Sequence, residues 1–463
     1  SHAQATIRPT RAADCRSSPL RGIVLLSVRA AMPDPLRWWN QFPLALRNVT
    51  RIRLLASIGA GGVIFMTPLI FHAINFSASQ VGSGLALAAL IGTVVRLISG
   101  VLIDRGLRCS WPIRVTTLLA IAGDVILVQA NDYSHFLMGQ VLLGCAAGLY
   151  WPAIELAVPL SCAQVPSGRG YALVRSADAL GIGFGALIGT VASTQGALRI
   201  VYGVEALCMG AVLILISLRP LQDDRPAHGS SQVVEKTTSR GVPATPTWLL
   251  PLVPVLATSV VATGILALQQ SALPLDLVQG SLQRPSLTES HSSALIALQL
   301  TLLVSLQWPV GRWLSNRSVG FGLSISLASF SLGCVLIALS SLFTAGTALV
   351  LVSLLPMAFA QAAFLPTATE AVIEETPPEH RGLAMALFSQ CFTVSAIVAP
   401  LLGGAMLDHL NNGLLLWLLM GGACLAMLPA LRNLRPRFTA DGSSSERNSQ
   451  AEVQGAEKTL SML

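Results

Sequence analysis

Ionisable side chains that interrupt long apolar segments are the residues of this sequence with the clearest chemical potential. They are Arg96, Asp124, Glu155, Arg175, Asp178, Glu205 and Glu370. A charge among apolar neighbours is costly to keep, so such a group needs a counter-charge or must bind and release a proton. Ion pairing and proton transfer are therefore the chemistry that these residue types and positions indicate.

The elements that hold these residues are apolar segments long enough to cross a membrane. Of the 463 residues, 53% are hydrophobic and 11% are charged, against about 25% charged in soluble domains. The mean hydropathy is +0.66. Two sets of six segments have the length that the ~30 Å hydrocarbon layer requires. The first set comprises 54–76, 81–103, 113–130, 136–160, 172–193 and 201–218, and the second comprises 248–275, 294–314, 321–339, 345–373, 383–407 and 414–431. The sequence therefore predicts an all-α integral membrane protein.

A polar stretch between the two sets predicts a division into two bundles. Residues 220–246 have a linker composition that does not bury a core. We expect an N-terminal six-helix bundle at 47–219, a C-terminal one at 247–434, and disordered tails at 1–46, which is basic, and at 435–463. The apolar run of the first tail is too short to span a membrane, and we expect no signal peptide. Lys and Arg in short loops predominate on the linker side, which predicts that the linker and both termini are cytoplasmic.

The loop after the second segment carries closely spaced glycine and charged residues that have a degenerate copy in the second half of the chain. The residues are Gly100, Asp104, Arg105 and Arg108, and the copy has Gly311, Asn316 and Arg317. Other landmarks recur in order: YWP at 150–152 matches FLP at 364–366, and Arg169-Gly170 matches Arg381-Gly382. Such a repeat predicts two halves related by an axis along the membrane normal.

These motifs and their order resemble those of the major facilitator superfamily of transporters, over roughly residues 51–434. The resemblance implies twelve helices in two bundles and alternating access to a central cavity. In that family the loop after the second helix is a conformational latch on the cytoplasmic side. Asp104 is therefore expected to meet the start of the eleventh helix near Arg381. The alternative is local pairing of Asp104 with Arg105 or Arg108, a solvated contact of little energy.

The resemblance also implies positions for a cavity and a hinge. The first, fourth, seventh and tenth helices of the family line the cavity, which here implies Phe65, Gln140, Tyr150, Trp151, Gln269, Gln270, Gln361 and Phe364. The fifth and eleventh helices lie between the bundles, which implies a hinge or sliding surface at Gly181, Gly185, Gly189, Pro400 and Gly403. Tight helix packing is the alternative interpretation of these residues. A lining of amides and aromatic rings suits an amphipathic or weakly polar solute.

Arg96, Glu155 and Asp178 fall at a similar depth in their segments. Arg96 lies eight residues before Asp104, which is about 12 Å along a helix. We expect Arg96 to pair with Glu155 or Asp178, because a lone guanidinium at that depth is costly. The alternative is proton coupling through Glu155 or Asp178. Glu370 is a further candidate for coupling, because the resemblance puts its helix at the cavity.

Other chemistry finds no support in the sequence. Asp124 and Glu205 fall on helices that are peripheral in the family's fold, so we do not expect them to couple transport. No P-loop motif is present, and the eight cysteines are scattered singly rather than spaced as metal ligands. The basic residues do not gather in one patch, which argues against nucleic-acid binding. We therefore expect no enzymatic activity, no cofactor, no metal and no nucleic-acid partner.

The sequence thus predicts a secondary transporter in the inner membrane of a bacterium. We expect it to act as a monomer in the lipid bilayer on a small organic solute, with the proton as coupling ion. Export is expected rather than import. An uptake permease of the same fold is one alternative, and a non-transporting membrane scaffold or assembly factor is the other.

Overall fold

The computed structural model describes residues 39–163, 165, 167–221, 249–314, 317–377, 380–431 and 434. Nearly all of the expected tails and linker lie outside these residues. In the described part, twelve helices are long and apolar enough to cross a membrane, which confirms that prediction. The helices are α3 (Leu44–Ala73), α4 (Ala78–Asp104), α5 (Ser110–Gln129), α6 (Tyr133–Ser161), α7 (Ser167–Thr194), α8 (Ile200–Leu218), α9 (Leu249–Gln279), α10 (Glu289–Leu314), α11 (Val319–Ser340), α12 (Gly346–Glu374), α13 (Arg381–Leu410) and α14 (Leu414–Leu431).

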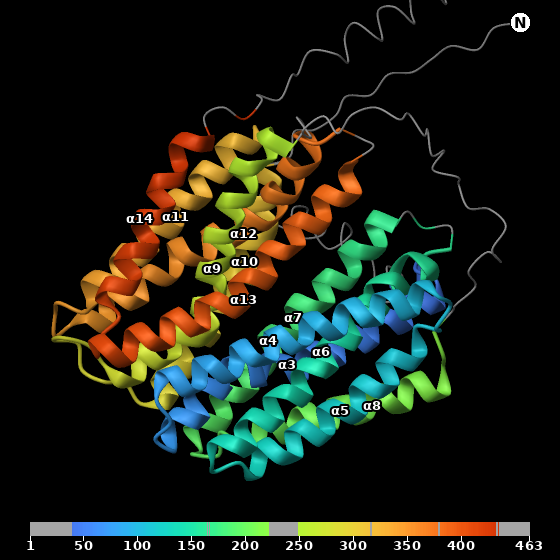
Figure 1. The fold of residues 1–463 in the computed structure, drawn as a ribbon, viewed down its shortest axis with the longest axis horizontal. Helices are drawn as coiled ribbons and strands as arrows, with labels where there is room; N and C mark the ends of the chain where they lie inside the picture. The colour runs from blue at the N-terminus through green and yellow to red at the C-terminus, as the bar shows by residue number, and fades with distance from the viewer. Residues whose placement is uncertain are drawn as a thin grey trace, which may run out of the picture.

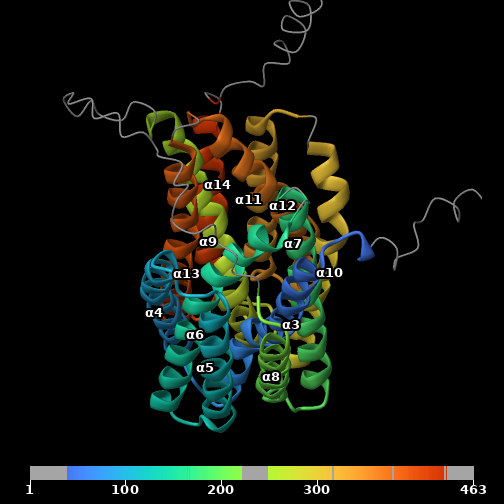
Figure 2. The same cartoon turned by 90° about the vertical axis from the view of Figure 1, so that its right-hand side faces the viewer.

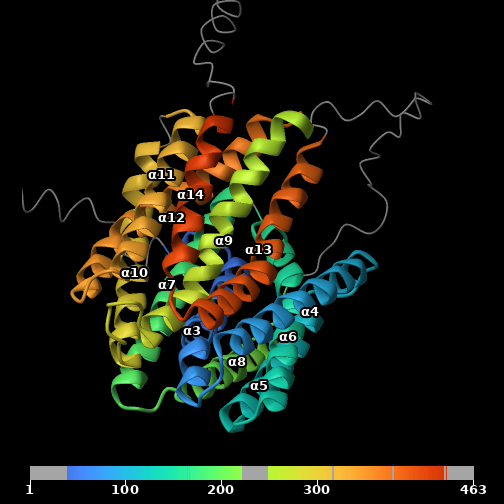
Figure 3. The ribbon, with the colours of Figure 1, turned by 60° about the vertical axis from the view of Figure 1, so that its left-hand side comes forward.

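The helices form two bundles of six. Figure 1 shows α3 to α8, the N bundle, on one side of the molecule and α9 to α14, the C bundle, on the other. Between the bundles, α4 lies beside α13 and α7 lies beside α10 (Figures 2 and 3). We call the end of the molecule where α8 ends and α9 begins the linker end, and the opposite end the far end. The N bundle begins slightly earlier than expected, because α3 starts at Leu44 rather than at residue 47.

Local sequence sets a sharp turn between α3 and α4 at the far end. Asn75 has a φ of 68°, a left-handed conformation that asparagine tolerates better than most residues. Ser77 then caps α4 in a capping box. Its hydroxyl accepts from the Gln80 amide at 3.2 Å, and the Gln80 side chain accepts from the Ser77 amide at 3.0 Å. The turn therefore presents the first residues of α4 to the neighbouring bundle.

Small residues let the bundles touch backbone to backbone at the far end. A Cβ on Gly82 of α4 would lie 2.2 Å from the carbonyl oxygen of Pro400 in α13. A Cβ on Gly404 of α13 would lie 2.4 Å from the carbonyl oxygen of Ala78. Real Cβ atoms do not approach so closely, so only glycine fits at these two positions.

Hydrogen bonds reinforce this closure. Asp408 of α13 accepts from the backbone amides of Ala78, at 2.9 Å, and Ser79, at 2.7 Å. These amides belong to the first turn of α4, where they have no intrahelical partner and where the helix dipole favours a negative charge. On the other side of the molecule, the Thr190 hydroxyl of α7 donates to the Ser293 carbonyl of α10 at 3.1 Å. The far end is thus closed by both packing and polar contacts.

The linker end lacks such packing at the glycines of the expected latch. A Cβ on Gly100 of α4 or on Gly311 of α10 would have no heavy atom within 4 Å. Leu97, one turn before Gly100, is 63% exposed. At the far end, Gly82 and Gly404 allow a close approach of helices. Gly100 and Gly311 make no such approach at the linker end.

We predict that Asp408→Asn weakens the closure of the far end. The variant keeps an acceptor oxygen but loses the charge that the α4 dipole stabilises by about 0.3–1 kcal/mol, so the open fraction should rise about two- to five-fold. Spin labels at the exposed residues Gln195 and Leu282 would report it as a longer component in the distance distribution.

Asp132→Asn is the matched control for this experiment. Asp132 is also an acid at the far end, but it contacts only Ser134 and His135 of its own segment. These two contacts hold the pKa of Asp132 below its usual value. An unchanged distance distribution for Asp408→Asn, or an equal change for Asp132→Asn, would contradict the prediction.

Candidate functional site

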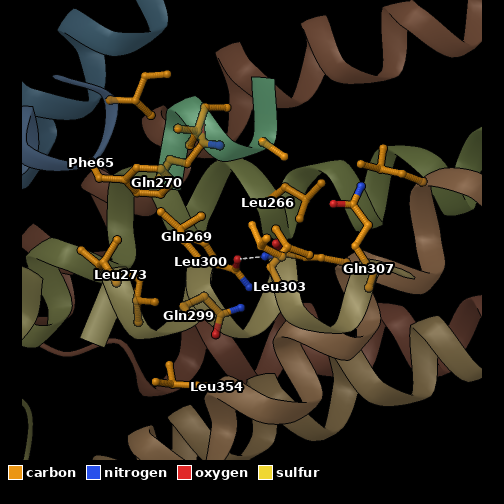
Figure 4. A pocket seen from close by; sticks show the side chains of 18 of the residues that line it. Phe65, Leu266, Gln269, Gln270, Leu273, Gln299, Leu300, Leu303, Gln307 and Leu354 are labelled. Atoms are coloured by element: carbon orange, nitrogen blue, oxygen red, sulfur yellow. Dashed lines mark hydrogen bonds between the residues drawn. The ribbon is translucent and has the colours of Figure 1, made fainter. Parts of the chain in front are cut away.

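A central cavity of about 300 Å³ lies between the bundles. Its walls come from α3 and α7 of the N bundle and from α9, α10 and α12 of the C bundle. Figure 4 shows Phe65 of α3 at one side of the cavity and Gln307 of α10 at the opposite side. Most of the lining is aliphatic, so the few polar side chains in it determine which solute groups can be bound.

Five glutamines supply most of the polar lining of the C bundle. They are Gln269 and Gln270 on α9, Gln299 and Gln307 on α10, and Gln361 on α12. Each carries both a donor and an acceptor without a net charge. The cavity therefore presents neutral hydrogen-bonding groups from three helices.

The three buried glutamines are held by neighbouring groups. The Gln361 amide donates to the Gln269 side-chain oxygen, and the Gln269 amide donates to the Met357 sulfur at 3.1 Å. With its amide turned so that the nitrogen donates, Gln299 bonds to the Leu354 carbonyl at 2.9 Å. These contacts fix the orientation of the amides before a ligand arrives, which lowers the entropy cost of binding.

The opposite wall contains Asp178, which belongs to an ion pair. Arg53 of α3 lies 2.8 Å from Asp178 of α7, and both side chains are largely buried. The Ser57 hydroxyl donates to Asp178 at 2.5 Å. The Arg53 guanidinium also lies over the Trp151 ring, 4.1 Å from its centroid, which is a cation–π contact. Asp178 thus has two stabilising neighbours, Arg53 and Ser57, and the charge of Arg53 is paired.

The prediction that Arg96 forms an ion pair with Glu155 or Asp178 is wrong. Asp178 pairs with Arg53, and Glu155 pairs with Arg175 at 3.0 Å. Arg96 instead lies over the Trp151 ring, 5.9 Å from its centroid. Its Nε atom is buried without an acceptor among the described residues. The depth argument was correct in requiring compensation for Arg96. The compensation comes from the Trp151 ring and from the charge of Glu155, which acts on Arg96 without an ion-pair contact.

A second cavity of about 240 Å³ lies inside the N bundle. Tyr150 and Trp151, which we expected at the central cavity, line this second one together with Glu205. Asp178 lines both cavities and therefore stands on the wall between them.

The remaining expected lining residues divide between the central cavity and the bundle cores. Phe65, Gln269, Gln270 and Gln361 line the central cavity. Gln140 and Phe364 are buried elsewhere, and the Phe364 ring packs near Phe330 with centroids 6.5 Å apart.

The glycines of α7 pack within the N bundle rather than between bundles. A Cβ on Gly181 would lie 2.6 Å from the Ser57 Cβ of α3, and one on Gly185 would lie 2.1 Å from the Ile58 carbonyl. Gly189 is equally close to Met66 of α3. Gly403 meets Leu268 and Ala272 of α9 in the C bundle, and Pro400 contacts the partner bundle through Gly82. Tight packing thus describes the glycines, and a hinge role stays a prediction.

The expected latch lies mainly outside what the structure describes. Its key side chains, Asp104, Asn316 and Arg381, are outside the described part. Arg105 and Arg108 are exposed, and Gly106 leaves α4 with a φ of 103°, which glycine adopts without strain.

The structure also describes the contacts of Arg317, which we expected in the latch, and the position of Glu370, which we expected in proton coupling. Arg317 lies over the rings of Trp313 and Phe321, 5.8 and 5.6 Å from their centroids. Glu370 lies in α12, but it is not among the residues that line the central cavity.

Arg53, Gln299 and Gln307 are the functional candidates that sequence analysis missed. Arg53 was placed before the first apolar segment, whereas α3 begins nine residues earlier at Leu44. The two α10 glutamines belong to a helix that the family resemblance does not emphasise. Their spacing of eight residues puts both on one helix face and is the signal that could have found them.

We predict that the ion pair between Arg53 and Asp178 is a stability determinant of the N bundle. Arg53→Gln leaves a buried carboxylate without its counter-charge, which should lower the free energy of unfolding by about 3 kcal/mol. Combining it with Asp178→Asn should recover most of the loss, because two neutral amides can bond to each other. Unfolding titrations of the purified protein in mixed detergent micelles measure both effects.

Arg175→Gln is the control for these variants. Its ion pair with Glu155 has side chains 58% and 35% exposed, so its loss should cost at most about 1 kcal/mol. Equal effects of Arg53→Gln and Arg175→Gln, or a double variant as unstable as the single one, would overturn the assignment.

Comparisons with known proteins agree with this architecture. The family model described as the Major Facilitator Superfamily matches residues 52–282 and 255–460. Comparison with curated proteins gives no match. Among solved structures, the nucleoside transporter NupG is similar, with a TM-score of 0.69 and 13% identity over 84% of this chain and 99% of that one. The peptide transporter POT has a TM-score of 0.68 and 13% identity over 84% and 93%.

A POT family transporter in complex with 5-aminolevulinic acid is also similar, with a TM-score of 0.66 and 12% identity over 84% of this chain and 95% of that one. Identities this low support the fold alone. The family model, in contrast, covers most of the chain in two overlapping matches. The chain therefore belongs to the Major Facilitator Superfamily and is a multi-pass membrane transporter rather than an enzyme.

Proposed function

We propose that the protein moves a small, polar and uncharged solute by alternating access and exports it in exchange for protons. The observation that carries the proposal is the central cavity, which is lined by five glutamines and lies between bundles that are closed together at the far end. A cavity of about 300 Å³ is at the small end of the range for ligand sites, which favours a small solute.

The charge balance of the cavity supports an uncharged solute. The charged side chains that line it, Arg175 and Asp178, each have a partner of opposite charge. A charged solute would lose its hydration without gaining an unpaired counter-charge, which is unfavourable. Uncharged solutes with amide-like donors and acceptors, such as nucleosides, complement the glutamines. A solved structure of similar fold is named for nucleoside transport, which fits this choice.

The position of Asp178 supports exchange with protons. Asp178 lines the same cavity as the glutamines, so its protonation would release Arg53 and change the field at the solute site. Two ligands that alter one another's site in this way compete, and competition is the requirement for antiport. Glu155, which holds Arg175 at the same wall, is the second acid we assign to coupling.

The proposed topology has the linker end in the cytoplasm, as the basic loops favour. The closed far end then faces the outside, and the structure represents an inward-facing state. We propose that the monomer is the working unit. We place it in the inner membrane of a bacterium.

We propose further that the loop from Asp104 to Arg108 closes the linker end in the opposite, outward-facing state. The Asp104 carboxylate would then meet the first turn of α13, as the Asp408 carboxylate meets the first turn of α4. We expect Asp104→Asn to lower transport and to increase labelling of cysteines placed in the linker-end half of the cavity. Unchanged labelling in the folded, inserted variant would rule this latch out.

We predict that Gln361→Leu impairs transport while leaving the protein folded. Removing the amide deletes the bond to Gln269 and one group for the solute, each worth about 0.5–1.5 kcal/mol, so KM should rise about tenfold. The measurement is counterflow of labelled uridine into proteoliposomes loaded with the same solute.

Gln140→Leu is the matched control, because Gln140 is also a buried glutamine but does not line the central cavity. Equal effects of both substitutions would remove the glutamine cluster from solute binding. If no solute of a broad neutral panel exchanges and no pH gradient drives uptake, the chain is better described as a membrane scaffold.

A further inference from the structure

We infer that Asp124 and Glu205 form a proton-binding site inside the N bundle, away from the solute cavity. Asp124 lies on α5 and Glu205 on α8, and they are 1% and 5% exposed. The inference deepens the proposed function, since it assigns the site where the coupling proton is held. It also revises the expectation that these two acids have no part in coupling.

The two acids face each other without a cation. Their carboxyl groups are close enough to act directly on one another. Both carboxylate oxygens of Asp124 and the Oε2 atom of Glu205 are buried without a hydrogen-bond donor in the described part of the chain. None of the ion pairs among the described residues includes either acid. Two carboxylates in such a setting cannot both stay ionised, so the pair requires a proton between them.

The groups around the pair do not supply the missing positive charge. Arg53 of α3 reaches the cavity beside Glu205, but its guanidinium is committed to Asp178. Tyr150 of α6, and Tyr202 and Cys208 of α8, carry neutral side chains, and the Tyr202 hydroxyl bonds to Thr67 at 3.0 Å.

The basic side chain on α8 nearest in sequence is also committed elsewhere. Arg199, at the far-end start of α8, donates to the carbonyl oxygens of Val128 and Ala130 at 2.6 and 2.8 Å. A proton is therefore the ligand that the site lacks.

The second cavity gives this site a connection to the solute cavity. Glu205 lines the cavity of about 240 Å³ inside the N bundle, and so do Ser57 and Asp178. Asp178 also lines the central cavity. A proton can thus pass from the central cavity to Asp178 and then, through space lined by hydroxyl and carboxyl groups, to Glu205. The transfer is a simple relay in which the Asp178 carboxyl loses a proton and the Glu205 carboxylate gains it.

The packing of Glu205 provides a mechanical link to the same helix that lines the solute cavity. A Cβ on Gly59 of α3 would lie 2.9 Å from the Glu205 Cα, so α3 and α8 touch at the proton site. Farther along α3, Phe65 lines the central cavity. A change of charge at Glu205 therefore acts directly on the helix that contacts the solute.

Infrared spectroscopy of the full-length protein in liposomes tests the site without knowledge of the solute. The probe is the proton itself, applied as a step from alkaline to acidic pH. We expect a carboxyl C=O component that grows with acidification, shifts in heavy water and is missing from the spectrum of the double variant Asp124→Asn, Glu205→Gln, while the components of Asp178 and the other acids remain. Asp132→Asn, which removes an exposed acid, should leave this component intact. A double-variant spectrum identical to that of the unmodified protein overturns the site. A component that does not respond to pH also overturns it, because the pair is then permanently neutral.

A transport measurement separates this inference from the proposed function. Asn and Gln preserve shape and hydrogen bonding, so the double variant should keep solute counterflow and lose accumulation driven by a pH gradient. Retention of full accumulation by the double variant overturns the inference. Absence of counterflow in the unmodified protein contradicts the proposed solute class instead, and the infrared result still decides the proton site. If the double variant does not insert, Glu205→Gln alone is measured against Asp132→Asn in the same two assays, with the same outcomes deciding.

Discussion

The contact between α3 and α7 is the interaction on which the rest of the N bundle depends. Glycines 181, 185 and 189 bring the α7 backbone against α3, and the ion pair between Arg53 and Asp178 closes the same interface. Both side chains are largely buried, so the pair forms only because the glycines allow its helices to approach. The ion pair at this interface therefore depends on the glycine packing.

The two bundles divide the chemistry between them. Charged groups that face the cavities come from the N bundle, whereas the C bundle contributes amides. The buried charges of the C bundle lie away from the cavity. Arg284 binds Asp276 at 3.1 Å, and the Trp417 indole donates to the same carboxylate at 3.1 Å. This ion pair fastens the α9–α10 connection to the bundle at the far end. Solute recognition and proton handling can thus vary in different halves of the chain.

The helices and their grouping in two bundles could be predicted from the sequence because apolar length is a local property. The pairing of charges could not, because it depends on how each helix is rotated about its axis. Arg53 illustrates the point. It follows Arg47 and Arg51 and looks like a loop residue, yet α3 continues through all three and turns Arg53 inward. Asp178 was recognised as needing a partner, but only the structure shows that the partner is Arg53 and not Arg96.

The residues of the candidate site could also be predicted from the sequence only in part. Gln269, Gln270 and Gln361 were expected from the family resemblance, and they do line the cavity. Glu205 and Asp124 were set aside because their helices are peripheral, an argument about position in the fold that ignores what a buried acid requires. The absence of a counter-ion for these acids cannot be read from the sequence, because it is a property of every helix that surrounds them.

The cap that Asp408 places on α4 has a consequence for how variation accumulates at this interface. Its donors are the backbone amides of residues 78 and 79, which every amino acid except proline provides. The hydrogen bonds themselves therefore require no particular side chain on α4, while the α13 half depends on a single carboxylate. Packing still limits the side chain of residue 78, but the hydrogen bonds select for a side chain only at the acceptor. The partnership therefore leaves no trace of paired substitutions in a comparison of sequences.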